Sequence, residues 1–230
     1  MSASARTVAP MSAGNAGTRS AATAAAWVSG EPERLQLDAT SWVDVFRGWM
    51  HSAPGVFDDL ARDLPWRQGR TWRYDHYVPE NRLHTSAAPN VHPALLAAHK
   101  ALRNRYGVEF ERPSLCFYQH GGHAMGAHRD REMRWLEDTV IGILSLGVRR
   151  PFLLIPRSSR RDGPRQGIDI APGNGDLLVM GGRAQADWLH AVPPAVTREA
   201  RISVQWRWTS RRGRPEKGPG YYAPRHYGRS

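Results

Sequence analysis

The sequence has very little cysteine. Its 230 residues contain one, Cys116, which excludes a disulfide framework and a cysteine-based zinc site within one chain. Long apolar runs are also missing, since none approaches the roughly 18 residues that cross a bilayer. The first 30 residues lack the apolar core of a secretory signal. These absences predict a reducing compartment, the cytoplasm (associated with the nucleoid if the source is bacterial), and no membrane partner.

Acidic residues are scarce at both ends of the chain, although the net charge is +11. Residues 1–30 carry two arginines and no acid, and residues 209–230 carry six Lys/Arg against one acid. We expect both to be disordered extensions, although the first also has the composition of a transit peptide. The second mixes arginine with tyrosine and glycine, which also suits loose contact with nucleic acid. For residues 31–208 we expect one domain, acting as a monomer.

Two stretches have apolar residues at helical spacing. Residues 38–50 carry Trp, Val, Phe and Met on one helical face behind a polar start, which predicts a first helix. Residues 93–106 predict a second helix, with Asn90 near its start, Pro93 in its first turn and Gly107 as its stop. Residues 66–90 have no clear period, and we expect short strands and an irregular loop over a surface there.

After Gly107 the pattern changes to short apolar runs separated by turns, namely "SLCFY", "TVIGILSLG", "PFLLIP", "GIDIAPGNG", "DLLVMGG" and "RISVQWRW". Such runs are typical of antiparallel strands. They predict a mainly β fold with flanking helices, built as a sandwich or a barrel.

The last of these runs alternates between an apolar and a polar face. Its two arginines, Arg201 and Arg207, lie on the polar face, about 20 Å apart at about 3.3 Å per residue. Two long side chains that curl toward each other would leave a gap suited to a small dicarboxylic acid. The alternative is an outward-facing strand with solvated arginines.

A histidine and an aspartate, His128 and Asp130, are one residue apart and share a face if the segment is extended. His190 lies 60 residues beyond Asp130, after a strand-like run, so an antiparallel fold can bring it beside the pair. Two histidines and one carboxylate on one side of an iron ion leave positions open for other ligands. The same set can hold zinc, and three unrelated polar residues are the remaining interpretation.

The order of these residues is itself informative. The chain has His128-x-Asp130, then His190, and then Arg201 and Arg207 six positions apart. This order resembles the Fe(II)- and 2-oxoglutarate-dependent dioxygenases of the AlkB family, which repair alkylated nucleic-acid bases.

The neighbouring sequence carries the same resemblance. The similar segments are "FYQHGGHAMGAHRDRE", "VIGILSLGVRRPFLLIP", "GDLLVMGGRAQADWLHAVP" and "ARISVQWR". The resemblance covers residues 113–207 well, residues 57–106 loosely and neither tail. It implies a double-stranded β-helix (jelly-roll) core over about 113–208, N-terminal helices, and a nucleotide-recognition lid at about 66–90.

The resemblance also implies roles for individual residues. The two histidines and Asp130 would hold Fe(II), and Arg201 would bind the distal carboxylate of 2-oxoglutarate. Arg207 would lie by the keto-acid end and the substrate, and Tyr118 would hydrogen-bond the cosubstrate. Bidentate arginine contact with a carboxylate is geometrically selective, so lysine should replace Arg201 poorly.

The implied reaction consumes 2-oxoglutarate and O2, releases succinate and carbon dioxide, and hydroxylates an N-alkyl carbon of a base, which then leaves as an aldehyde. The base must be flipped out of a duplex or come from a single strand, of DNA or RNA. It would stack on His128 and on a lid residue, with Tyr74, Tyr77 and His84 as candidates. Glu132 matches the acid that reaches the base edge, or else forms an exposed ion pair with a neighbouring arginine.

Two departures from the family pattern bear on function. Cys116 stands where many relatives carry an asparagine that contacts the cosubstrate, and a thiol is a weaker donor. Alternatively it is a small buried hydrophobe. Residues 83–87 also lack the expected aromatic-rich lid ending. Two alternatives therefore stay open, a 2-oxoglutarate-dependent hydroxylase of a protein or small metabolite, and a catalytically dead basic nucleic-acid-binding module.

Overall fold

The structure is a computed structural model and describes residues 30–73, 76–88, 90–130, 133–158 and 167–217. The predicted N-terminal extension up to residue 29, residues 218–230 of the predicted tail, Tyr74 and Glu132 lie outside the described residues. None of the described helices combines the length and apolarity needed to cross a membrane.

Antiparallel strands make up most of the described chain, with three helices among them. In chain order the elements are β1 (Glu33–Gln36), β2 (Ser41–Phe46), α1 (Ala53–Asp63), β3 (Arg67–Arg73), β4 (His76–Ser86), α2 (Pro93–Tyr106), β5 (Ser114–Tyr118), β6 (Met125–His128), β7 (Thr139–Gly147), β8 (Leu153–Pro156), β9 (Ile168–Asp169), β10 (Leu177–Gly182), α3 (Ala184–Asp187), β11 (Trp188–Val192) and β12 (Arg201–Thr209). The predicted mainly β fold with flanking helices is confirmed.

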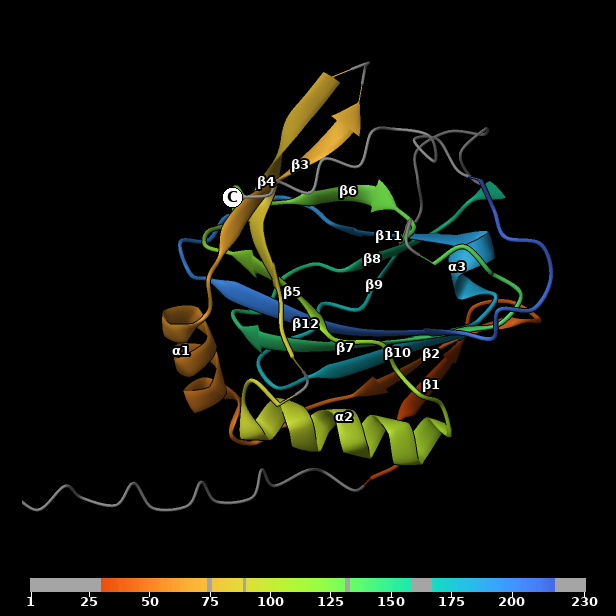
Figure 1. Cartoon of the computed structure of the whole chain (residues 1–230), viewed down its shortest axis with the longest axis horizontal. Helices are drawn as coiled ribbons and strands as arrows, with labels where there is room; N and C mark the ends of the chain where they lie inside the picture. The colour runs from red at the N-terminus through yellow and green to blue at the C-terminus, as the bar shows by residue number, and fades with distance from the viewer. Residues whose placement is uncertain (1–29, 74–75, 89, 131–132, 159–166, 218–230) are drawn as a thin grey trace, which may run out of the picture.

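The strands form two antiparallel sheets that face each other. The large sheet has the order β1-β2-β10-β7-β12-β5-β4-β3, and the small sheet has the order β6-β11-β8-β9. In Figure 1 the helices α1 and α2 lie against the outer side of the large sheet, and the small sheet lies on its other side. This is the double-stranded β-helix that the resemblance implied.

The central strand β7 shows why the sequence folds this way. Its alternate residues Leu144 and Leu146 pack against the helices, and Ile141 and Ile143 pack against the small sheet. A strand buried on both faces reads as a continuous apolar run, which is what "TVIGILSLG" is. The helices and the small sheet therefore cover both faces of one central layer.

The closing strand β12 has the predicted alternation. Val204 and Trp206 are fully buried and belong to the core beneath the helices. On the other face, Arg201 is 1% exposed and Ser203 is 2% exposed. The polar face thus points between the sheets, and the alternative of solvated arginines on an outward-facing strand is wrong.

The second predicted helix is confirmed as α2, which ends at Gly107 with a φ of +67°. Its N-cap is His92, whose ring accepts a hydrogen bond from the Ala94 backbone N–H, so Asn90 is not the cap. The predicted lid is more regular than expected. Strands β3 and β4 pair as a hairpin, and β4 joins β5 at the end of the large sheet.

The first predicted helix is wrong, because residues 41–46 form strand β2 between β1 and β10. Both faces of β2 are buried, so apolar residues occur on both faces and the period-two alternation of a half-buried strand is absent. The helical spacing of the tryptophans is a coincidence. Gly48 has a φ of +59°, which interrupts a helix. The first helix of the structure, α1, begins only at Ala53. A separate difference is that the predicted strand "GIDIAPGNG" contains only the two-residue strand β9.

Asp176 secures the turn that leads into β10. Its carboxylate accepts hydrogen bonds from the backbone N–H groups of Gly48 (2.8 Å) and Gly173 (2.9 Å) and from Arg47 (2.8 Å). Burial raises the pKa of Asp176, but these donors outweigh it and lower the pKa below its usual value. The charged form therefore stabilises the fold.

We expect Asp176→Asn to lower the free energy of unfolding by about 1.5 to 3 kcal/mol at neutral pH, because it weakens hydrogen bonds to a charged group. Since the folded pKa is depressed, this contribution is present above the unfolded pKa of about 3.9 and is lost as the pH falls through the folded value. Urea denaturation at several pH values measures it. A difference between wild type and variant that stays constant down to about pH 2 would contradict this account.

Candidate active site

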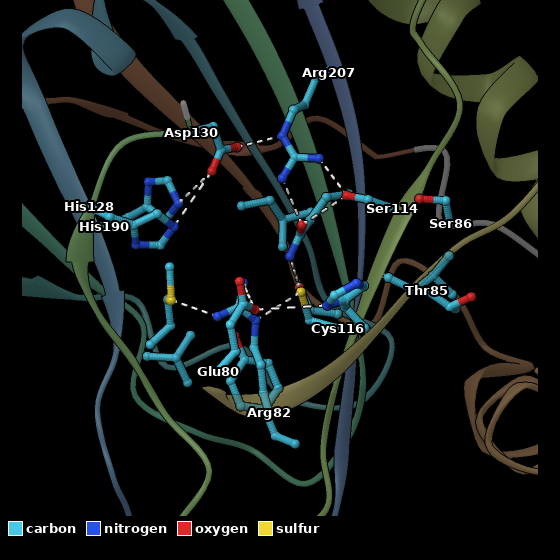
Figure 2. Close-up of a pocket in the computed structure, with 18 of the residues that line it drawn as sticks. Glu80, Arg82, Thr85, Ser86, Ser114, Cys116, His128, Asp130, His190 and Arg207 are labelled. Atoms are coloured by element: carbon cyan, nitrogen blue, oxygen red, sulfur yellow. Dashed lines mark hydrogen bonds and ion pairs between the residues drawn. The ribbon is translucent and has the colours of Figure 1, made fainter. Parts of the chain in front are cut away.

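A cavity of about 520 Å³ opens between the two sheets, near the hairpin (Figure 2). Its walls come from β4 and β5 on one side, β6 and β11 on another, and the polar face of β12. His128, Asp130 and His190 all line it, as do Cys116, Tyr118 and Arg207. The fold thus gathers in one cavity residues as far apart in the sequence as Arg70 and Arg207.

The two histidines meet because their strands are paired. In the antiparallel ladder of β6 and β11, His128 lies directly opposite His190, and the ring centroids are 4.3 Å apart. His190 also stacks on Phe152, with centroids 5.8 Å apart and an angle of 15° between the planes. Phe152 therefore fixes the plane of the His190 ring.

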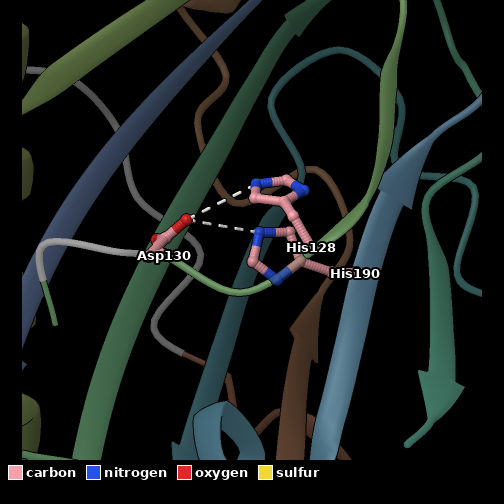
Figure 3. A group of neighbouring side chains, drawn as sticks. All are labelled: His128, Asp130 and His190. Carbon is pink, nitrogen blue, oxygen red and sulfur yellow. Dashed lines mark ion pairs between the residues drawn. The ribbon is translucent and has the colours of Figure 1, made fainter. Parts of the chain in front are cut away.

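Asp130 completes the group from the loop after β6 (Figure 3). Its Oδ1 lies 3.6 Å from Nε2 of His128 and 3.5 Å from Nε2 of His190. The backbone N–H of Asp130 donates to the side-chain oxygen of Gln185, 3.0 Å away and itself buried. Gln185 therefore holds the loop in the position that brings the carboxylate to the histidines.

These three side chains can offer ligand atoms that lie within 4.8 Å of one another, and no other such trio occurs in the described part of the chain. Nδ1 of His128 is 2.8 Å from the carbonyl oxygen of Gly126. A carbonyl only accepts, so Nδ1 carries the proton and Nε2 offers its lone pair to the site. Burial, and after it the proximity of His128, lowers the pKa of His190, which favours the neutral imidazole that a metal ion requires.

Arg207 fixes the second oxygen of the aspartate. Its Nε donates to Oδ2 of Asp130 at 2.6 Å, while its other nitrogens donate to Ser114 and Gln205. Burial raises the pKa of Asp130, but the Arg207 charge and the contacts with the histidines outweigh it and hold this pKa well below its usual range. Since Oδ2 is occupied, Oδ1 is the oxygen that faces the histidines.

Tyr118 and Arg201 are cross-strand partners on β5 and β12. Burial raises the pKa of Tyr118 to about 12, so its hydroxyl keeps its proton and can donate. Arg201 donates to the Ser145 hydroxyl at 2.8 Å, while its Nε and Nη1 are buried without a hydrogen-bond partner. Arg201 lies behind the Tyr118 ring, 5.6 Å from its centroid, and is not part of the cavity wall.

Of the four predicted substrate residues, one lines the cavity. His84 lines the cavity, next to Glu80, with Nδ1 of His84 3.9 Å from the Glu80 carboxylate. Tyr77 is on the hairpin but does not line the cavity. Tyr74 and Glu132 lie outside the described residues, so their predicted roles stay predictions.

Sequence reasoning missed several residues of the cavity and its support. Arg82 and Glu80 lie on the cavity face of β4 with His84, and their i, i+2 spacing in "ENRLHTS" was the available signal. Ser114 shares the face of β5 with Cys116, at the same spacing. Gln185 gave no signal, because only the folded chain brings it to Asp130.

A protein-family model matches most of the chain. The model described as "2OG-Fe(II) oxygenase superfamily" matches residues 47–214, which include the whole candidate site. Among solved structures, a Trichoplax adhaerens prolyl hydroxylase has a TM-score of 0.55 at 12% identity, covering 72% of this chain and 83% of that one. A Pseudomonas putida prolyl-4-hydroxylase has a TM-score of 0.50 at 15% identity, covering 72% of this chain and 91% of that one. These two likenesses support the fold alone.

Curated relatives share the name "Alpha-ketoglutarate-dependent dioxygenase alkB homolog 3". The Bos taurus protein is 28% identical over 177 residues, covering 69% of this chain and 62% of the relative. The Homo sapiens protein is 25% identical over 174 residues, covering 67% and 61% respectively. The matched region thus spans about three fifths of the length of these relatives.

The residues present fit the ion and cosubstrate of that superfamily, Fe(II) and 2-oxoglutarate. Two imidazole nitrogens and one carboxylate oxygen are donors that suit Fe(II) with positions left open. The same donors can hold zinc, so it is the superfamily match that favours iron. The two unpartnered nitrogens of Arg201 are donors that a buried carboxylate can satisfy. His128, Asp130 and His190 would hold the ion, and Tyr118 and Arg201 are the predicted cosubstrate contacts.

We expect Arg207→Met to weaken binding of Mn(II), a probe for the iron site, by about 10- to 100-fold, because Asp130 loses the partner that orients it. Titration followed by electron paramagnetic resonance measures the affinity. The matched control is Arg103→Met, which removes an arginine paired with Glu109 on the outer helix and should leave the affinity unchanged. Equal affinities for Arg207→Met and wild type would mean that Arg207 does not position the ligand.

Proposed function

The chain belongs to the 2OG-Fe(II) oxygenase superfamily. We propose that it oxidatively removes alkyl groups from nitrogen atoms of bases in DNA or RNA. Fe(II), 2-oxoglutarate and O2 together supply oxidation of a C–H bond, with succinate and carbon dioxide as the products from the cosubstrate. The chain's own residues must hold these groups and bring the alkyl carbon to them.

The observation that carries the proposal is the similarity to the alkB homolog 3 proteins over about two thirds of this chain. Other features support it. The cavity of about 520 Å³ has room for a base beside the cosubstrate, and the net charge of +11 favours a nucleic-acid partner. We propose that the protein acts as a monomer in the cytoplasm.

Each part of the cavity then has a task. Arg207 keeps one carboxylate oxygen of Asp130 directed at the metal position, and Phe152 keeps the plane of His190. The His128 side chain is 25% exposed, and its ring is the surface on which we expect the flipped base to stack. Hairpin residues on β4 would cover the other face of the base.

The assembled ligand group argues against the catalytically dead alternative, because its three donors lie close enough together to hold one ion. The hydroxylase alternative differs from base dealkylation only in its substrate, so an assay that follows both succinate and the methylated base distinguishes these two functions.

We expect iron-loaded protein, given O2, to form succinate and formaldehyde with an oligonucleotide that carries 1-methyladenine and 3-methylcytosine, with matching loss of methyl groups by mass spectrometry. Asp130→Ala should abolish both products, since one ligand is lost. The control Asp187→Ala removes a half-buried aspartate that is paired with Arg183 and does not line the cavity, and it should leave turnover intact. Succinate without demethylation would reject this substrate and favour the hydroxylase alternative.

His84→Ala should lower kcat/KM on the methylated oligonucleotide by roughly 5- to 150-fold, if its ring stacks on the base at about 1 to 3 kcal/mol. Tyr77→Ala should have a smaller effect, because Tyr77 does not line the cavity. Steady-state kinetics of both variants decide this. Unchanged kinetics for His84→Ala would remove His84 from the lid assignment.

A further inference from the structure

Arg82 projects from the hairpin strand β4 into the cavity. The sequence alone gave it no role. Figure 2 shows Arg82 and Glu80 on the side of the cavity across from Asp130 and Arg207. The Arg82 side chain is 13% exposed, so its charge is largely withdrawn from water. A buried charge of this kind needs partners that compensate for its lost hydration.

Two of the three partners described for Arg82 are weak hydrogen-bond acceptors. Its Nε donates to Sγ of Cys116 at 3.3 Å, and its Nη1 donates to Sδ of Met125 at 2.6 Å. Thiol and thioether sulfur atoms are weak acceptors. Its oxygen partner is the Glu80 carboxylate, 3.3 Å from Nη2. In contrast, all the described acceptors of Arg207 are oxygen atoms.

The charges around the cavity favour an anion. The ionised side chains on its wall are the arginines Arg70, Arg82, Arg129 and Arg207 and the acids Glu80 and Asp130. Arginine outnumbers acid there, and a bound divalent ion adds two more positive charges. A dicarboxylate would balance this excess, and a guanidinium with poor acceptors is the group that gains most from it.

The position of Arg82 suits the cosubstrate. Arg82 contacts Cys116 and Met125 on the cavity wall and lies near Tyr118, whereas Arg201, 5.6 Å from the centroid of the Tyr118 ring, does not line the cavity. Cys116 supplies no strong donor at this point of the wall. The guanidinium of Arg82, which contacts the thiol, provides one instead.

We propose that Arg82 binds a carboxylate of 2-oxoglutarate beside Tyr118 and supplies the donor that the Cys116 thiol does not. Glu80 holds the guanidinium in place through Nη2 and competes with the cosubstrate for its charge. The inference rests on superfamily membership and is independent of whether the substrate is a base.

The test is the affinity of Zn(II)-loaded protein for 2-oxoglutarate, measured by isothermal titration calorimetry without nucleic acid. Arg82→Met should bind 2-oxoglutarate about 10- to 100-fold more weakly than wild type, as expected for loss of charge-assisted hydrogen bonds. The control Arg62→Met removes an exposed arginine on helix α1, paired there with Asp59 and Asp63 away from the cavity, and should leave the affinity unchanged.

Two further variants keep the test decisive if Arg82→Met folds poorly. Glu80→Gln removes the competing charge and should raise the affinity for 2-oxoglutarate about two- to fivefold, on the scale of a weak ion pair. Cys116→Asn adds an amide donor and should recover part of the affinity lost in Arg82→Met. Unchanged affinity in both Arg82→Met and Glu80→Gln overturns the proposal.

A different result would also overturn it. If Arg82→Met binds 2-oxoglutarate like wild type but binds the methylated oligonucleotide more weakly, Arg82 contacts nucleic acid and not the cosubstrate. Because the calorimetry contains no nucleic acid, failure of this inference and failure of the proposed dealkylation give different patterns.

Discussion

The site depends on the contact between Arg207 and Asp130, 2.6 Å from Nε to Oδ2 inside the cavity wall. Asp130 is 8% exposed, and an unpaired carboxylate at that depth would be costly. The arginine compensates this cost. It also gives the two carboxylate oxygens different roles, since Oδ2 is bound to Arg207 and Oδ1 faces His128 and His190. The same contact ties the loop after β6 to the closing strand β12. Metal binding and strand packing are thus linked through one ion pair.

Strand β12 provides this link because its two faces are so different. Val204 and Trp206 are fully buried beneath the helices, which fixes the strand relative to the large sheet. Arg201 and Arg207, on the opposite face, are then held at set positions between the sheets. Apolar packing on one side therefore determines where Arg207 meets the cavity and where Arg201 lies beside Tyr118. The core beneath the helices therefore sets the position of Arg207, although Val204 and Trp206 do not line the cavity.

Much of this architecture was predictable from sequence, because short apolar runs and turn residues determine strands locally. The metal group was also predictable, since "HRD", the later His190 and the two arginines of the last strand follow one another in the order of a known family pattern. The helix over residues 38–50 was wrong because pairing between strands overrode a helical period in β2, which is buried on both faces. Gln185 and Arg82 could not be assigned their contacts, because these depend on the folding of α3 and the hairpin around the cavity.

The central claim is that His128, Asp130 and His190 hold one metal ion beside a 2-oxoglutarate molecule. The most direct measurement is a crystal structure of the protein with Mn(II) and 2-oxoglutarate. The account predicts an ion bound by both Nε2 atoms and by Oδ1 of Asp130, with Oδ2 still on Arg207 and the keto acid chelating the ion. An ion bound elsewhere, or an Asp130 turned away from the histidines, would contradict it.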